Sequence, residues 1–408
     1  MRIVLFDREE MLKIGGISVY TQRLYKYLTA AGHQVYIFRF SNKRVKEPHV
    51  YCIPYYLAES RSFIFLPTES SLSLLKKYLI ELRPDIVYTP IGLSPLDFFL
   101  PSTCRELKIP LAGVWHFDFN KSSGTYQVLA KSVFLAYVSF CKQLDLLHVF
   151  SNKLANFYSN RGVERNKMLI LPNGINPDIY KQKKISDFAV KYKIKTGILF
   201  LGRLTLPKNP ELLIRSFLSL NPPQDIKLVI VGCGDLDEEL REQYKDKRII
   251  FTGLIKDETE KIDIMNACQI FVLPSMFEGA SLALLEAMSC QMACIVSDAG
   301  GNTEALDKAG IILPVSHLRH ELPVALKICL DNPILVNHLG REARHRILKY
   351  YSQEAQFHKL TTAIHKTISR FNAKKVYRTK PADFSQSFLN KMDYVFQKIK
   401  QLGAYLTE

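Results

Sequence analysis

The sequence lacks paired cysteines, a long apolar run and a leader pattern, and each absence narrows what the protein can be. Its eight cysteines are scattered, with no C-x-x-C pair and no His/Cys cluster at zinc spacing, so we expect reduced, buried thiols. The most apolar helix-like run, SVFLAYVSFC, is about half of the ~20 residues that span a bilayer. The first residues, MRIVLFD, have a strand pattern rather than the basic and apolar regions of a signal peptide. We therefore expect a cytoplasmic protein.

Acidic residues are also scarce relative to basic ones. The chain has 55 Lys and Arg against 39 Asp and Glu, a formal net charge of +16. Such a charge favours an anionic partner: a phosphorylated substrate, an anionic membrane surface or a nucleic acid. No RNA- or DNA-binding motif is recognisable, so a nucleic-acid partner is not expected. Apolar residues spaced by three and four between Phe384 and Leu402 predict a basic amphipathic helix, which either docks on the protein or lies on a membrane.

Short, nearly continuous apolar runs alternate with longer helical patterns, and the series occurs twice. The first series is RIVLF, QVYIF, DIVYT, LAGVW and LLHVF, and the second is GILFLG, KLVIVG, RIIFTG, IFVLP and ACIVS. Runs that are apolar on both faces predict parallel strands covered by helices on each side. The fold class is therefore α/β, with two doubly wound Rossmann-like domains at 1–172 and 195–350. A turn-rich linker at 173–194 separates them, and helices follow at 351–408.

The stretch FEGASLALLEAM carries two carboxylates around an apolar run. Glu278 is expected in the loop after the strand IFVLPS, where open α/β sheets bind ligands, and Glu286 on the helix that starts near Ser281. The N–H groups of the first helical turn favour a phosphate, and Gly279 and Ala280 let the backbone approach closely. A sugar and a ribose would then flank that diphosphate, one at each carboxylate. The spacing alone is equally that of ordinary loop and helix glutamates, so neighbouring segments decide.

Three other segments contribute candidate residues. GRLTLPKNPELL places Arg203 and Lys208 in a loop after a strand, either as a solvated pair or as cations that hold a pyrophosphate and stabilise its charge as it leaves. KIGGISVYTQRL places Gly15 and Gly16 at a turn into a helix, without the full G-x-G-x-x-G spacing of a dinucleotide site. VWHFDF places His116 at the end of a strand, as a structural residue or facing the cleft.

The D-x-D sequence at Asp235–Asp237 is the one acidic motif of the kind that binds metal. It directly follows Gly232-x-Gly234 and is expected to start a helix, with Asp235 as the N-cap and the acids of DLDEE near the positive end of the helix dipole. We therefore assign no metal site.

Taken together, these segments resemble the retaining nucleotide-sugar glycosyltransferases of family 4, which have the GT-B fold. The resemblance rests on FVLPSMFEGASLALLEAMSCQMACIVSDAGGNTEAL with GR…K upstream, on LPNGINPDIY, on VGCGDLDEELRE and on GGIS. These motifs cover most of residues 1–350 in the family's order. The chain departs from the family at Gln291, Met292 and Ala293, where a Gly-x-Pro is usual, and at Ala280, where Phe is common. These changes affect packing or sugar selectivity and remove no charged group.

The resemblance implies a role for each candidate residue. Glu286 would hold the ribose hydroxyls and Glu278 those of the transferred sugar, while Arg203 and Lys208 would bind the diphosphate. The implied catalytic residues are Arg203, Lys208, His116 and Glu278. The implied residues for binding the sugar donor are Gly15, Gly16, Gly279, Ala280, Ser281, Leu282 and Glu286. Gly300, Gly301 and Glu304 match a family turn without an assigned role.

The implied fold is two Rossmann-like domains whose parallel sheets face a central cleft, followed by C-terminal helices that cross back. The implied activity is transfer of a hexose from a nucleoside-diphosphate sugar to a lipid or saccharide hydroxyl, with retention and without metal or another cofactor. The basic surface fits peripheral contact with an anionic membrane and a role in glycolipid or cell-envelope polysaccharide synthesis. Two alternatives remain: a GT-B-like nucleotide-sugar epimerase, and a non-catalytic protein that binds nucleic acid or an anionic surface.

Overall fold

The structure is a computed structural model, and it describes residues 1–7, 16–42, 47–59, 64–91, 95–115, 137–183, 185–276, 278 and 281–374. The chain divides into a large unit, Met1–Ile368, and a second unit, Ser369–Glu408. Of the second unit, only the end of one helix is described, so the amphipathic pattern between Phe384 and Leu402 lies outside the described residues. Within the described ranges, no helix is long and apolar enough to cross a membrane.

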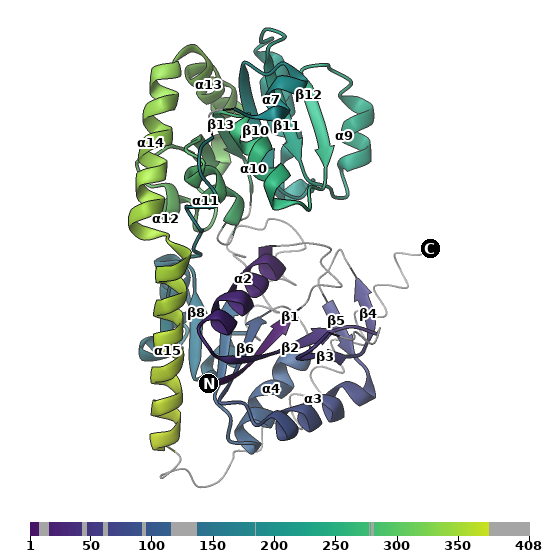
Figure 1. The fold of residues 1–408 in the computed structure, drawn as a ribbon, viewed down its shortest axis with the longest axis vertical. Helices are drawn as coiled ribbons and strands as arrows, with labels where there is room; N and C mark the ends of the chain where they lie inside the picture. Colours follow the sequence, from purple (N-terminus) through teal and green to yellow (C-terminus); the bar gives the residue numbers. More distant parts are fainter. Residues whose placement is uncertain are drawn as a thin grey trace. The chain divides into compact units, whose positions relative to one another are not determined.

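The first half of the large unit contains a sheet of seven parallel strands in the order β3-β2-β1-β6-β7-β8-β9 (Figure 1). The strands are β1 (Arg2–Asp7), β2 (Gln34–Phe40), β3 (Val50–Ile53), β6 (Ile86–Ile91), β7 (Leu111–Trp115), β8 (Leu146–Val149) and β9 (Met168–Ile170). The helices with stated bounds are α2 (Gly16–Ala30), α3 (Glu69–Leu82), α4 (Pro95–Glu106) and α6 (Asn152–Ser159). The aromatic-rich segment after β3 forms an antiparallel pair, β4 (Tyr55–Glu59) and β5 (Ile64–Pro67).

Helices cover both faces of this sheet because its strands are apolar on both sides. In β1, Val4 and Phe6 belong to a core shared with α3 and α4, whereas Ile3 and Leu5 belong to a core shared with α2. That second core also includes Phe357 of the last described helix, α15 (Gln353–Lys374). A side-chain period of two therefore divides one strand between two cores, as a doubly wound sheet requires.

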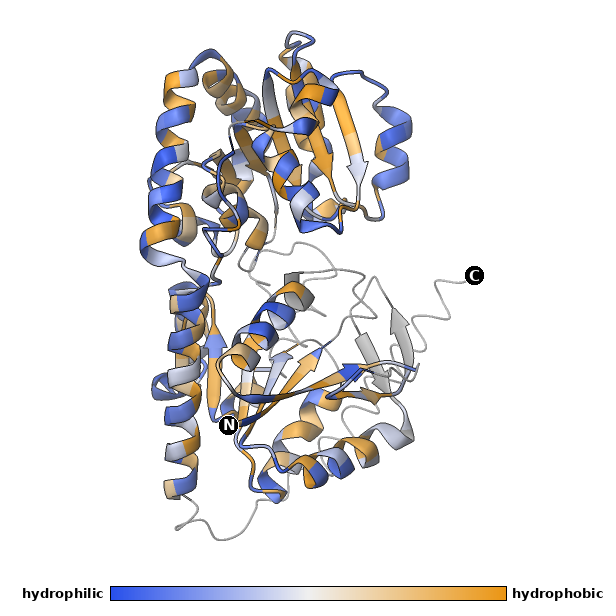
Figure 2. Ribbon diagram, viewed as in Figure 1, coloured by the Kyte–Doolittle hydropathy of each residue, from blue (hydrophilic) through white to orange (hydrophobic). Residues whose placement is uncertain are grey.

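The second half of the large unit contains six parallel strands in the order β12-β11-β10-β13-β14-β15. The strands are β10 (Thr196–Leu201), β11 (Ile226–Val231), β12 (Ile249–Gly253), β13 (Ile270–Leu273), β14 (Ala293–Ser297) and β15 (Ile311–Leu313). The helices are α8 (Pro210–Ser219), α9 (Asp237–Gln243), α10 (Glu258–Asn266), α11 (Leu282–Ser289), α12 (Asn302–Leu306), α13 (Leu318–Asp331) and α14 (Pro333–Tyr350). The strands are largely hydrophobic in Figure 2, while α9 is largely hydrophilic. The predicted fold class, two doubly wound parallel sheets with C-terminal helices, is confirmed.

The segment between the sheets, predicted as a turn-rich linker, contains a helix that the sequence analysis missed. This helix, α7 (Asp187–Tyr192), is capped by Ser186, whose side chain accepts a hydrogen bond from the Ala189 N–H at 3.1 Å. In the part of the linker that precedes α7, the carbonyls of Pro177 and Tyr180 accept hydrogen bonds from the guanidinium of Arg344 in α14. The same guanidinium donates to the carbonyl of Ser289 in α11, and these bonds are 2.7–2.9 Å long. The linker is thus tied to α11 and α14 through its own backbone.

The start of α9 differs from the expectation that Asp235 caps it. The helix begins at Asp237, its N-cap is Leu236, and no side chain caps it. The reason is a backbone contact: the N–H of Leu236 donates to the carbonyl of Leu204 at 3.0 Å, so the chain is still held to the loop after β10 at this point. Gly234 makes this approach possible, because an added Cβ would lie 2.4 Å from the Leu204 carbonyl oxygen.

A buried chain of hydrogen bonds crosses the second core of the first sheet. Tyr20 lies 3.1 Å from the Tyr88 hydroxyl, which lies 2.7 Å from Nδ1 of His148, and Nε2 of His148 lies 2.7 Å from the carbonyl oxygen of Leu171. A carbonyl only accepts, so Nε2 carries the hydrogen and Nδ1 accepts from Tyr88. Burial lowers the pKa of His148 to about 4, which keeps the ring neutral.

This histidine makes stability depend on pH. Because the folded pKa lies below the unfolded value of about 6.5, its contribution is complete above pH 6.5 and is lost as the pH falls towards 4. We expect the free energy of unfolding to fall by about 2 kcal/mol between pH 7 and pH 5 from this group. Urea unfolding at the two pH values measures this change in the wild type and in His148→Gln. The glutamine amide still donates a hydrogen bond but does not titrate. Equal pH slopes in the two proteins would contradict the assignment.

Candidate active site

The strand order of the second sheet places its topological switch point between β10 and β13. Consecutive helices leave these two strands towards opposite faces, so their carboxyl ends open a crevice where α/β proteins bind ligands. The loop after β10 carries Arg203 and Lys208, the latter in a 3₁₀ turn, and the loop after β13 carries Glu278. The two loops are joined by a hydrogen bond of 2.8 Å from the Met276 N–H to the carbonyl of Pro207.

Lys208 and Glu278 meet across this switch point. The ammonium of Lys208 forms an ion pair with Oε1 of Glu278, which also accepts a hydrogen bond of 3.1 Å from the hydroxyl of Ser275. Both side chains are largely buried. The sequence placed them in neighbouring loops with separate roles, and the structure joins them directly. Arg203 lies in the same loop as Lys208 and is exposed.

Helix α11 begins beside this pair. Ser281 is its N-cap, and its side chain accepts a hydrogen bond of 3.2 Å from the Leu284 N–H, while Leu282 is the first helical residue. The helix therefore starts where the sequence indicated, with the positive end of its dipole at the loop of Glu278. Gly279 and Ala280 lie outside the described residues, as do Gly15 and His116. Gly16 is described as the first residue of α2.

Glu286, the second predicted carboxylate, has a different set of partners. Its Oε1 accepts a hydrogen bond of 2.9 Å from Arg23 Nη2, and both its oxygens lie 3.1 Å from Lys261 Nζ. Lys261 comes from α10, on the same sheet, whereas Arg23 comes from α2 on the other sheet. The Glu286 side chain is only 5% exposed.

Tyr180 and Glu258 complete this cluster. Arg23 Nη2 donates to the Tyr180 hydroxyl at 3.0 Å, and that hydroxyl donates to Glu258 at 2.6 Å. Burial, the largest single influence, lowers the pKa of Arg23, but Glu286, Tyr180 and Glu258 together outweigh it and raise the pKa. Burial, with the charge of Glu286, raises the pKa of Tyr180, so the phenol stays protonated. Two cations thus face two carboxylates in a partly buried site.

Sequence reasoning missed Arg23, Lys261, Tyr180 and Glu258. Arg23 shares the amphipathic helix α2 with Lys26, and Lys261 stands in the mainly acidic α10. Neither residue has a distinctive spacing to Glu286. The one available signal was the position of Arg23 in the helix that the sequence predicts after the Gly15–Gly16 pair.

Glu304, to which no role was assigned, also joins the two halves of the large unit. Its carboxylate oxygens lie 3.3 and 3.4 Å from the backbone N–H groups of Asn152 and Lys153, the first residues of α6. The first N–H groups of a helix have no partner within the helix, so an acidic side chain from elsewhere can satisfy them.

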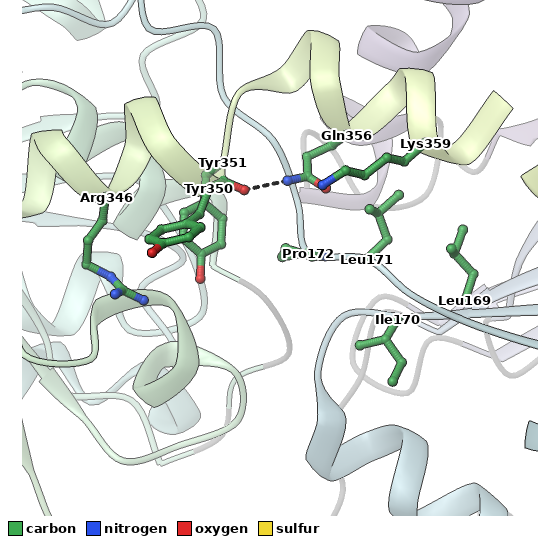
Figure 3. A pocket seen from close by; sticks show the side chains of 9 residues that line it. All are labelled: Leu169, Ile170, Leu171, Pro172, Arg346, Tyr350, Tyr351, Gln356 and Lys359. Carbon is green, nitrogen blue, oxygen red and sulfur yellow. Dashed lines mark hydrogen bonds between the residues drawn. The ribbon is translucent and has the colours of Figure 1, made fainter. Parts of the chain in front are cut away.

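A separate pocket of about 460 Å³ lies where α14 meets α15 and is lined by Leu169, Ile170, Leu171, Pro172, Arg346, Tyr350, Tyr351, Gln356 and Lys359 (Figure 3). Gln356 donates to the carbonyl of Tyr350 at 2.5 Å at its edge. None of the predicted site residues lines this pocket, so the crevice at the switch point remains the candidate active site. In the part of the chain that the structure describes, no three His, Cys, Asp or Glu side chains are grouped to hold a metal ion.

The two Rossmann-like sheets and the last helix, which packs on the first sheet, define the GT-B class of fold. Solved structures share it. Sucrose-phosphate synthase from Thermosynechococcus elongatus matches with a TM-score of 0.74 at 19% identity, over 91% of this chain and 100% of that one. HepE from Anabaena in complex with UDP matches with a TM-score of 0.72 at 16% identity, over 90% of this chain and 100% of that one.

Sequence comparisons identify the family within that class. Residues 195–332 match the family described as Glycosyl transferases group 1, and residues 14–179 match Glycosyltransferase Family 4. The alpha-monoglucosyldiacylglycerol synthase of Streptococcus pneumoniae is 26% identical over 71% of this chain and 69% of its own length. A Campylobacter jejuni N-acetylgalactosaminyltransferase, named for a diphospho-undecaprenol acceptor, is 29% identical over 52% of this chain and 58% of its own length. The chain belongs to the family 4 type of GT-B glycosyltransferases.

Proposed function

We propose that this protein transfers a hexose from a nucleoside-diphosphate sugar to an acceptor hydroxyl, with retention of the anomeric configuration. The observation that carries this proposal is the Lys208–Glu278 pair across the switch point, beside the start of α11. One cation, one carboxylate and the positive end of a helix dipole there suit a diphosphate attached to a sugar. Glu286 lies farther along the same helix, and we assign it to accept hydrogen bonds from the ribose hydroxyls.

The reaction separates positive charge on the sugar ring from negative charge on the diphosphate, and these residues can stabilise both. The bond between the anomeric carbon and the phosphate oxygen breaks, the acceptor oxygen bonds to the same face of that carbon, and its proton passes to the departing phosphate oxygen. Negative charge builds on the diphosphate, where Lys208, Arg203 and the helix dipole stabilise it. Glu278 holds the sugar hydroxyls and favours positive charge on the ring. His116, outside the described residues, would lie beside the sugar and the acceptor.

The acceptor that we propose is a lipid or a lipid-linked saccharide in glycolipid or cell-envelope polysaccharide synthesis. Two observations support it: the relatives from Streptococcus pneumoniae and Campylobacter jejuni are named for lipid or lipid-linked acceptors, and this chain carries a net charge of +16. Basic residues near an anionic membrane each contribute about 1 kcal/mol of attraction, so peripheral binding would bring the crevice to its acceptor.

A thermal-shift panel of UDP-, GDP- and ADP-sugars, run with EDTA and then with magnesium, tests the donor assignment. We expect one nucleotide to raise the Tm without metal, since a ligand at 100 times its Kd stabilises the folded state by about 2.7 kcal/mol. UDP-glucose is the first choice because HepE was crystallised with it. Transfer to diacylglycerol vesicles and to polyprenyl-linked saccharides then tests the acceptor. No shift with any nucleotide, with or without magnesium, would contradict the proposal, whereas a shift only with magnesium would overturn the metal-free scheme.

A further inference from the structure

Glu286 is enclosed, and its oxygens are nearly saturated with hydrogen bonds. A carboxylate has about four lone-pair positions. Three are taken, one by Arg23 and two by Lys261, and only 5% of the side chain is exposed. A ribose that donates both of its hydroxyls needs two positions and a path to reach them. In the present arrangement Glu286 offers one position and almost no access.

Of the two cations, Arg23 is the one placed to leave. Lys261 contacts both oxygens of Glu286 from α10, an element of the same sheet. Arg23 contacts only Oε1 and reaches it from α2, which packs on the other sheet. The Arg23 contact therefore joins helices of the two different sheets, whereas the Lys261 contact joins two helices of the same sheet.

The hydrogen bonding of Arg23 is also incomplete. Its Nη1 is buried without a hydrogen-bond partner among the residues that the structure describes. A buried donor without a partner destabilises the arrangement that holds it. Arg344, an arginine with a structural role, differs: both of its terminal nitrogens donate, to Tyr180, Ser289 and Pro177. The contact between Arg23 and Glu286 is therefore easier to replace than the contacts of an arginine whose nitrogens are all hydrogen-bonded.

We propose that Arg23 occupies, in the nucleotide-free protein, a position on Glu286 that the ribose of the sugar donor takes over, so that nucleotide binding displaces Arg23 and couples ribose recognition to movement of α2. This inference rests on the proposed role of Glu286. Arg23 is then a competitor of the ligand and a positioning residue for the nucleotide-free state. Lys261 stays with Glu286 and keeps its charge balanced when the ribose binds.

The inference predicts the direction in which nucleotide affinity changes when Arg23 is replaced, and that direction tests it. Calorimetric titration with UDP, GDP and ADP, each alone, is compared for the wild type, Arg23→Ala and Arg23→Gln. Loss of the competitor should tighten binding of the preferred nucleotide about tenfold, within the 5- to 150-fold range usual for coupled equilibria. Lys26→Ala is the matched control because it removes an exposed cation one turn along the same helix, and its affinity should equal that of the wild type.

Each other result has a distinct meaning. Weaker binding in both Arg23 variants would overturn the inference and make Arg23 a direct ligand of the nucleotide, with the proposed function intact. Unchanged binding would also overturn it and leave Arg23 structural. Failure of the wild type to bind any of the three nucleotides would overturn the proposed function, and the inference with it.

Small-angle scattering without nucleotide adds an independent readout: both variants should have a larger radius of gyration than the wild type, and an equal radius would refute the coupling to α2.

Discussion

Replacing Glu286 with alanine is expected to weaken nucleoside-diphosphate binding by about 30- to 1,000-fold. The variant loses the acceptor proposed for both ribose hydroxyls, and truncating a buried charged hydrogen-bond partner usually costs about 2–4 kcal/mol of binding. It also leaves Arg23 and Lys261 in a largely buried site where, among the described residues, the half-exposed Glu258 is the carboxylate that remains. The free energy of unfolding should therefore fall by about 3 kcal/mol as well. Calorimetric titration and urea unfolding measure the two effects.

A double variant separates binding from stability. Arg23→Ala combined with Glu286→Ala removes one cation together with the carboxylate, so part of the lost stability should return while nucleotide binding stays weak. Glu286→Gln keeps the volume of the side chain and should also bind weakly. Recovery of nucleotide binding in the double variant would show that the carboxylate serves only to neutralise its neighbours, and would remove its assignment to the ribose.

Replacing Lys208 with alanine is expected to lower kcat by about 10²- to 10³-fold and to change the KM of the acceptor much less. Removal of one preorganised group that stabilises developing negative charge typically has an effect of this size. The substitution also leaves Glu278 with the hydroxyl of Ser275 as its remaining side-chain partner in the described part of the chain. Steady-state kinetics with varied sugar donor and acceptor separate turnover from binding.

Lys247→Ala is a suitable control for this experiment. Lys247 is an exposed lysine of the same half of the large unit, but it precedes β12 and so lies at the amino-terminal end of the strands, whereas the switch point lies at their carboxyl ends. Its removal should leave kcat unchanged. A loss of turnover that is equal in both variants would indicate a general effect of net charge, and an unchanged kcat in Lys208→Ala would end the assignment of Lys208 to the diphosphate.

Much of the fold could be predicted from local pattern. The stretches IVLF of β1 and ILFL of β10 are apolar at every position, which is stable only for strands covered on both faces, and both are central strands of parallel sheets. The same reasoning correctly placed Lys208 and Glu278 at the carboxyl ends of strands, because loop position follows from strand order. It failed for α7 and for the cap of α9, where a short helix and a backbone contact with Leu204 left no periodic signal.

The sequence alone determined the layers of this protein, the family it resembles and the two carboxylates at its candidate site, since each depends on residue type and spacing along the chain. The tertiary structure alone decided what those carboxylates touch. Glu278 pairs with a lysine 70 residues away, and Glu286 with an arginine 263 residues away. A charged side chain on a helix surface carries no sign of its partner, because attraction between charges depends on distance in space and on burial. Only the packed fold sets those two quantities.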